Sequence, residues 1–202
     1  GKEKIAKYIS KKYNLFHLDS GILYRRLASK LSKKNINIKN KKNLNDFLNS
    51  LIIISHRRHS SLRTEKIGKK ASIIATNKNI RNFINKQQRL VVNNILRSYK
   101  GCVIDGRDIG KKVFKNAQIK LFVSVSVEIR AKRRHKQLIE QGEKSIYSHI
   151  LKDLKLRDKK DINRAVSPLS RPPKSILINN SDSFKITCNQ INTILKKNRI
   201  FS

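Results

Sequence analysis

Short continuous apolar runs alternate with stretches of helical periodicity along this chain. The apolar runs predict strands at residues 15–18, 102–105, 119–125 and 175–179. Apolar residues at i, i+3 and i+4 spacing predict helices over residues 5–12, 67–96, 128–140, 150–156 and 184–197. A further helix is expected to begin at Ser20, as its N-cap, and to run through Leu31.

The alternation of strands and helices predicts an α/β fold. Continuous apolar character along a strand is typical of a parallel sheet that helices cover on both faces. A length of 202 residues suits one sizeable domain with a small inserted subdomain, so we expect a single domain over residues 1–202. Residues 35–62 are predicted to be polar and irregular, apart from the strand-like run Leu51–Ile54.

The chain is strongly basic, with 48 lysine and arginine residues, 13 aspartate and glutamate residues and a formal net charge of +35. Such a charge attracts any polyanion, which indicates a non-catalytic nucleic-acid-binding protein as one class of function. The lysines are spread along the chain, however, without arginine–glycine or aromatic interleaving. Because Lys, Asn and Ile are all favoured by A/T-rich codons, we prefer compositional drift as the explanation.

Cysteine and histidine usage indicates neither a metal centre nor a disulfide framework. Cys102 and Cys188 have no metal-ligand spacing, and we interpret both as reduced structural thiols. His56 and His59 lie in a basic stretch without a second pair of ligands nearby. No apolar run approaches the ~20 residues of a membrane span and no leader is recognisable, so we expect a cytoplasmic protein without membrane association.

Two predicted strands are followed directly by polar residues. These are Asp19, Ser20 and Arg25 in segment 18–25, and Asp105, Arg107 and Asp108 in segment 104–110. Open α/β sheets bind ligands at the carboxyl ends of their strands, and the arginine fork donates two parallel hydrogen bonds to phosphate. The pattern therefore predicts a polar crevice suited to a phosphorylated ligand.

A third cluster contains Arg157, Asp161 and Arg164, at spacings of four and three residues. On a helix this spacing places the three side chains on one face, as an arginine–carboxylate–arginine clamp. Taken alone, the cluster is better explained as a solvated helix surface with salt bridges.

In this order and at these spacings, the motifs resemble those of bacterial cytidylate kinases, almost from end to end of the chain. The matching segments are 18–25, 62–65 with Ala71-Ser72, 104–110, 127–134, 157–169 and 176–178. The resemblance implies a P-loop nucleoside-monophosphate-kinase fold with a small acceptor-binding insert, at residues 34–86, and a lid, at residues 130–165. It also implies transfer of the ATP γ-phosphate to CMP or dCMP, with Mg²⁺ held through the nucleotide phosphates, by a monomer without a specific nucleic-acid partner.

The resemblance assigns a role to each matching residue. For the acceptor, these are Ser72, Arg81 and Asp108 at the cytosine edge; Ser20, Arg157 and Asp161 at the sugar; and Arg25, Arg107 and Arg164 at the phosphate, with Asp19 and Tyr24 also in the substrate site. For ATP, they are Gly1, Lys2, Arg130 and Arg133. Those expected to act on the transferring group are Lys2, Arg133, Arg134, Arg157 and Arg164.

The chain departs from the family pattern at its start. The family's phosphate loop has the form G-x-x-x-x-G-K-[ST] or a close variant, and Gly1-Lys2 matches only its tail. With no methionine in the sequence, we expect an N-terminally truncated chain that lacks the central first strand, so that neighbouring strands keep unpaired edges. Glu3 stands where the family has Gly, Ser or Thr, and would repel a triphosphate unless it helps to hold Mg²⁺. The insert is shortened between Leu51 and Ser61, whereas the acceptor motifs are complete.

Overall fold

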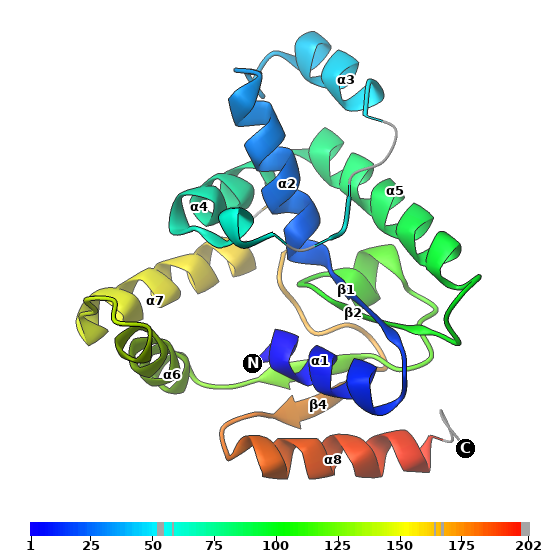
Figure 1. The fold of residues 1–202 in the computed structure, drawn as a ribbon, viewed down its shortest axis with the longest axis vertical. Helices are drawn as coiled ribbons and strands as arrows, with labels where there is room; N and C mark the ends of the chain where they lie inside the picture. The colour runs from blue at the N-terminus through cyan, green and yellow to red at the C-terminus, as the bar shows by residue number, and fades with distance from the viewer. Residues whose placement is uncertain (52–54, 58, 164, 167, 199–202) are drawn as a thin grey trace. The chain divides into compact units, whose positions relative to one another are not determined.

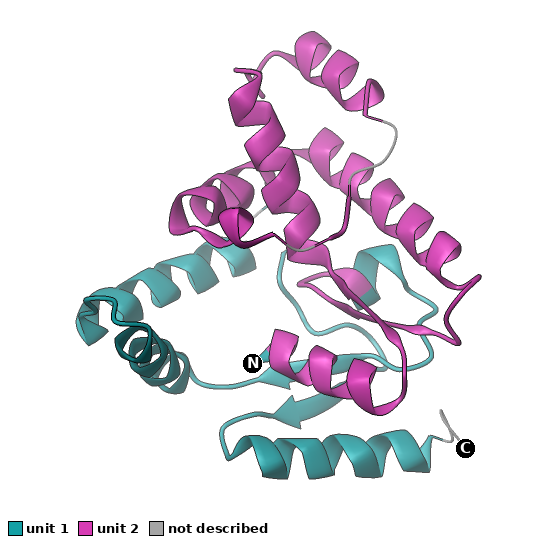
Figure 2. Cartoon of the chain, in the orientation of Figure 1, with its two compact units in different colours: residues 1, 110–202 teal, residues 2–109 magenta. Residues whose placement is uncertain are grey.

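The computed structural model describes residues 1–51, 55–57, 59–163, 165–166 and 168–198. The chain forms two compact units (Figure 2). We call residues 2–109 the first unit and Gly1 with residues 110–202 the second unit; the key of Figure 2 names them unit 2 and unit 1, respectively. The predicted bounds of the insert and the lid remain predictions. The strand-like run that was expected to end at Ile54 falls partly outside the described residues.

The unit of residues 2–109 is built around one pair of parallel strands. Its elements are α1 (Lys2–Lys12), β1 (Phe16–Asp19), α2 (Ser20–Lys33), α3 (Lys41–Asn49), the 3₁₀ helix η1 (Ser60–Arg63), α4 (Glu65–Ile74), α5 (Lys78–Ile95) and β2 (Cys102–Asp105) (Figure 1). The strands are in register from Phe16 opposite Cys102 to Asp19 opposite Asp105. Both strands therefore end on an aspartate at the same edge of the pair.

The unit of residues 110–202 contains the second parallel pair. Its elements are β3 (Leu121–Ser124), α6 (Val127–Glu140), α7 (Tyr147–Asn163), β4 (Ile176–Asn179) and α8 (Phe184–Lys197), and a short π-helix, η2 (Ile109–Val113), leads into it. Leu121 lies opposite Ile176, and Ser124 lies opposite Asn179. The parallel pairing agrees with the expected fold class. Among the described residues, the strands form two two-stranded sheets, β1–β2 and β3–β4.

The main apolar core of the first unit lies between its helices. On α2, Leu23 and Leu27 are fully buried, and they belong to one cluster with Ile80 and Ile84 of α5. Burial of one such aliphatic side chain contributes about 1.5–3 kcal/mol, so this cluster is a main source of stability for the helices that carry the candidate site.

Asparagine caps account for two differences from the predicted helices. The long helical region predicted over residues 67–96 consists of two helices. The Asn77 side chain accepts hydrogen bonds from the backbone of Asn79 (2.9 Å) and Ile80 (3.2 Å), and it caps the start of α5. The irregular stretch predicted over residues 35–62 contains α3, which Asn40 caps. The stretch is mostly polar, and this composition led to the prediction of irregular structure. Its helical signal is the pair Leu44 and Leu48, which lie four residues apart and are both buried.

The predicted N-cap at Ser20 is wrong. Asp19 is the cap, since its Oδ1 accepts the Gly21 N–H at 3.0 Å, and Ser20 is the first, buried residue of α2. Aspartate and serine are about equally good caps, so residue type alone does not choose between them. The choice follows from the backbone, because β1 ends at Asp19 and α2 begins at the next residue.

Both cysteines are free, as predicted, and partial burial raises the pKa of the Cys102 thiol. In the described part of the chain, no helix is long and apolar enough to cross a membrane.

Candidate functional site

The two polar segments predicted at strand ends lie together in the first unit. The loop after β2 packs against the start of α2 because Gly106 has no side chain: a Cβ there would lie 2.5 Å from Ile109 Cγ1 and 3.3 Å from Ser20 Cβ. The structure thus brings Asp19 and Ser20 close to the segment that carries Arg107 and Asp108.

A buried ion pair joins Arg81 of α5 to Asp108. The Arg81 Nη2 pairs with Asp108 Oδ2, and its Nη1 donates to the carbonyl of Ala75 at 2.9 Å. The Arg81 residue is only 3% exposed, and its guanidinium lies 6.0 Å from the centre of the Tyr24 ring. These contacts bring together three of the predicted site residues and fix the orientation of the Asp108 carboxylate. Ser72 lies exposed on α4.

Arg25 of α2 is half-buried against η1 and the start of α4. Its Nη1 donates to the carbonyls of Leu62 (2.8 Å) and Thr64 (3.2 Å). A Cβ at Gly68 would lie 3.0 Å from Arg25 Nη2, so the glycine makes room for the guanidinium. Burial lowers the pKa of Arg25, and the nearby Asp19 carboxylate opposes this effect.

Arg63 and Glu3 form an ion pair that the sequence did not indicate. The guanidinium of Arg63 donates to both carboxylate oxygens of Glu3, at 2.8 and 3.4 Å, and lies 3.6 Å from Asp19 Oδ2. Lys7 contacts the same carboxylate at 2.9 Å, one turn along α1. Partial burial alone would raise the pKa of Glu3, but hydrogen bonds from Arg63 and Lys7 outweigh it and lower this pKa from 4.5 to about 2.

His17 and Asp105 form a second contact that sequence analysis missed. His17 Nε2 lies 2.7 Å from Asp105 Oδ2, and the two side chains are mostly buried. In the parallel register His17 is opposite Val103, so Asp105 lies two residues along on the same face of the pair. Side chains alternate between the two faces of a strand, and this alternation was the available signal. To use it, one must know the register of β1 and β2, which the sequence does not provide.

In the second unit, Arg130 of α6 holds Asp158 of α7. The guanidinium bonds both carboxylate oxygens, one of them at 3.0 Å, and this hydrogen bonding raises the pKa of Arg130. Arg133 instead donates to three carbonyls in the turn after β4, those of Asn180 (2.8 Å), Ser181 (3.1 Å) and Asp182 (2.9 Å). Arg130 therefore joins the two helices, and Arg133 shapes the turn.

Four further predicted residues lie on helices α1, α6 and α7. On α7, Arg157 is exposed and Asp161, one turn further on, is buried, while Arg164 lies outside the described residues. Arg134 is exposed and donates to Gln137 Oε1 at 3.1 Å. Lys2 is the first residue of α1, where helix N–H groups and the helix dipole favour anions.

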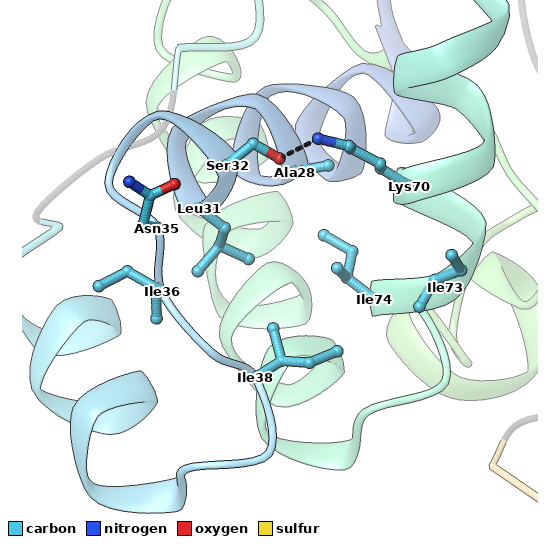
Figure 3. A pocket seen from close by; sticks show the side chains of 9 residues that line it. All are labelled: Ala28, Leu31, Ser32, Asn35, Ile36, Ile38, Lys70, Ile73 and Ile74. Carbon is cyan, nitrogen blue, oxygen red and sulfur yellow. Dashed lines mark hydrogen bonds between the residues drawn. The ribbon is translucent and has the colours of Figure 1, made fainter.

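A cavity of about 290 Å³ in the first unit lies apart from these residues. It is bordered by α2, α4 and the segment after α2, and Figure 3 shows that mainly apolar side chains line it. Two of the lining residues form a hydrogen bond, which Lys70 Nζ donates to Ser32 Oγ at 2.9 Å. Because none of the predicted site residues lines it, we do not regard this cavity as the functional site.

The described residues include no group of three or more His, Cys, Asp or Glu that could hold a metal ion. Arginines and carboxylates at the ends of parallel strands are nevertheless the side chains by which an α/β protein binds phosphorylated ligands. The arrangement thus fits the class of α/β proteins that bind phosphorylated ligands.

Comparison with known proteins identifies the family. A sequence profile described as "Cytidylate kinase" matches residues 1–198. The cytidylate kinase of Bartonella tribocorum is 35% identical over 201 residues, which are 97% of this chain and 91% of that protein. The cytidylate kinases of Thermosipho africanus and Fusobacterium nucleatum are 34% and 33% identical, over 97% and 98% of this chain and 88% and 91% of those proteins.

The chain therefore belongs to the cytidylate kinase family. Membership confirms the expected P-loop nucleoside-monophosphate-kinase fold class. The expected N-terminal truncation gains no support from these matches.

Proposed function

We propose that this chain transfers the γ-phosphate of ATP to CMP or dCMP. The observation that carries the proposal is the family match over residues 1–198, together with relatives that are themselves named cytidylate kinases. The nucleic-acid-binding alternative rests on the net charge alone and has no support from these matches.

Recognition of cytosine is assigned to Ser72, Arg81 and Asp108. The buried Arg81–Asp108 pair supports this assignment because it holds a carboxylate acceptor in a fixed orientation. Such an acceptor suits the exocyclic amine of cytosine, whereas uracil presents a carbonyl at that position and would face the carboxylate without a proton to share.

The remaining residues are proposed to bind the sugar and the phosphate of the acceptor. We assign the sugar to Ser20, Arg157 and Asp161, and the phosphate to Arg25, Arg107 and Arg164, with Asp19 and Tyr24 as further members of the site. The fixed, half-buried Arg25 supports the phosphate assignment, because a guanidinium held by backbone carbonyls is already oriented before the ligand arrives.

On the donor side, we assign ATP to Gly1, Lys2, Arg130 and Arg133. Arg134 would reach the transferring group from the lid. We propose that Mg²⁺ is held mainly through the nucleotide phosphates, as it commonly is. When bound with ATP, Mg²⁺ would neutralise phosphate charge.

The chemistry needs little from the protein beyond alignment and charge. A monophosphate is already ionised at neutral pH, so its oxygen can attack without a general base. Lys2 and the site arginines would hold two anionic reactants in line and neutralise the charge of the transferring group. Lid closure would keep out water, a competing acceptor.

We further propose that the protein acts as a monomer in the cytoplasm.

The test is a calorimetric titration of the chain with CMP, and with UMP as the control, at physiological salt. Selective binding of CMP followed by CMP-dependent consumption of ATP is the expected result. If circular dichroism shows a folded chain that binds neither nucleotide, the proposed function is wrong.

A further inference from the structure

Two arginines and two carboxylates alternate beside the end of β1. Arg25 is fixed by backbone carbonyls and lies within electrostatic reach of Asp19 and Arg63. Arg63, at the end of η1, lies 3.6 Å from Asp19 and bonds both oxygens of Glu3. Burial is the main cause of the lowered pKa of Arg25, and the positive charge of Arg63 lowers this pKa further. Two neighbouring like charges favour an anion between or beside them.

The contact between Arg63 and Glu3 uses the geometry by which arginine binds phosphate. A planar guanidinium offers two parallel N–H groups, and a carboxylate or a phosphate can accept them in the same way. A phosphate monoester carries up to two negative charges and three acceptor oxygens, and so competes well with a single carboxylate.

We propose that Arg63 is a further acceptor-phosphate-binding residue and that Glu3 occupies it as an internal competitor when no nucleotide is bound. This inference rests on the proposed function, since it takes CMP or dCMP as the incoming phosphate. It deepens that function by adding a residue, Arg63, and a competition step to the acceptor site.

Two features of the Glu3 contact make exchange easy. The side chains of Glu3 and Arg63 are 35% and 44% exposed, and ion pairs at such exposure are weakly held. Glu3 also keeps a second partner, because Lys7 contacts its Oε1 at 2.9 Å. When a phosphate takes Arg63, the carboxylate therefore remains paired and is not left as an isolated charge.

Four proteins test the proposal: the full chain, Glu3→Gln, Arg63→Gln and the double variant, each titrated with CMP and with cytidine. Removal of Glu3 should tighten CMP binding about 2- to 5-fold, the range expected for loss of an exposed ion-pair competitor. Arg63→Gln should weaken CMP binding roughly 10-fold, as for loss of a charged hydrogen-bond donor. Cytidine affinity should change in neither variant, because cytidine has no phosphate.

The double variant and a matched control separate competition from general charge effects. In the Arg63→Gln background, Glu3→Gln should no longer tighten CMP binding, because the competitor acts only through Arg63. Glu65→Gln is the control: Glu65 also lies in the first turn of a helix and pairs with a lysine four residues on, Lys69, at 2.6 Å. We expect this variant to bind CMP like the parent chain.

The outcomes distinguish this inference from the proposed function. If the parent chain binds CMP selectively over UMP but Arg63→Gln leaves CMP affinity unchanged, the inference is overturned and the proposed function stands. The inference is also overturned if cytidine affinity falls as much as CMP affinity, since Arg63 would then support the fold. Failure of a folded parent chain to bind CMP overturns both. Arg63→Lys, which keeps the charge and loses the fork, should lie between the parent and Arg63→Gln.

Discussion

In the first unit, two arginines assigned to the acceptor, Arg81 and Arg25, are held by fixed contacts, whereas most of the assigned arginines that are described in the second unit lie at helix surfaces. Arg81 is buried against Asp108, and Arg25 is half-buried against two backbone carbonyls. In the second unit, Arg133, Arg134 and Arg157 are exposed.

This difference matches the two tasks that the proposed reaction sets. Recognition of one base among several needs donors and acceptors with fixed orientation. A wrong base then leaves polar groups of the site without hydrogen-bond partners, and fixed groups cannot move to find others. Neutralisation of the transferring phosphoryl group would use charges that the proposed lid brings in as it closes. The buried Arg81 suits the first task, and an exposed arginine such as Arg134 suits the second.

The strongest test of this comparison is to break the buried pair. Asp108→Ala leaves the Arg81 guanidinium buried without its carboxylate, and we expect the free energy of unfolding to fall by about 3–5 kcal/mol. Urea denaturation measures the change. Asp153→Ala on α7 is the control, since Asp153 is exposed, and should alter this free energy by less than about 0.5 kcal/mol. Equal effects of the two substitutions would mean that the Arg81–Asp108 pair does not organise the first unit.

A second substitution tests how tightly the loop after β2 is packed. In Gly106→Ala the new methyl group would lie 2.5 Å from Ile109 Cγ1, so we expect a loss of about 1–3 kcal/mol in the free energy of unfolding. Ile109→Ala supplies the matched background, in which the same glycine change should be much less destabilising. An undiminished loss in that background would place the conflict elsewhere than at Ile109.

The sequence predicted the strands of both units well, because each is a continuous apolar run bounded by polar residues. It failed where a short polar side chain decides the local structure. The Asn77 cap divides a stretch of uninterrupted helical periodicity, and Asn40 starts a helix in a stretch that is mostly polar. Helix caps depend on the local backbone direction, which hydrophobic periodicity does not report.

The candidate site was predictable only in part, for a different physical reason. Resemblance to the family placed Arg81 and Asp108 in one site, and the structure pairs them. The contacts of Arg63 with Glu3 and of His17 with Asp105 were missed because they join residues 60 and 88 positions apart. Such contacts depend on strand register and chain topology.

Within the second unit, the comparison predicts that neighbouring arginines differ according to their contacts. Arg133→Ala removes three hydrogen bonds to the turn at residues 180–182, and we expect the free energy of unfolding to fall by about 1–2 kcal/mol, with faster amide exchange in that turn. Arg134→Ala removes one exposed bond and should change this free energy by less than about 0.5 kcal/mol. If both variants behave alike, Arg133 does not hold the turn.

The smallest expected effect concerns Glu3, whose exposed pair with Arg63 makes it the exception in the first unit. Its pKa is about 2 in the folded chain and 4.5 without these contacts, so the ionised form is the one that folding favours. The stabilisation is therefore complete above about pH 4.5 and is lost as the pH falls through about 2. Because both side chains are more than a third exposed to water, we expect Glu3→Gln to lower the free energy of unfolding by no more than about 1 kcal/mol at pH 6, and by less as the pH falls. Urea denaturation of both proteins across this range measures the difference. A loss that is large, or that does not shrink in acid, would mean that Glu3 is held as firmly as Asp108 and is not free to leave Arg63 for a phosphate.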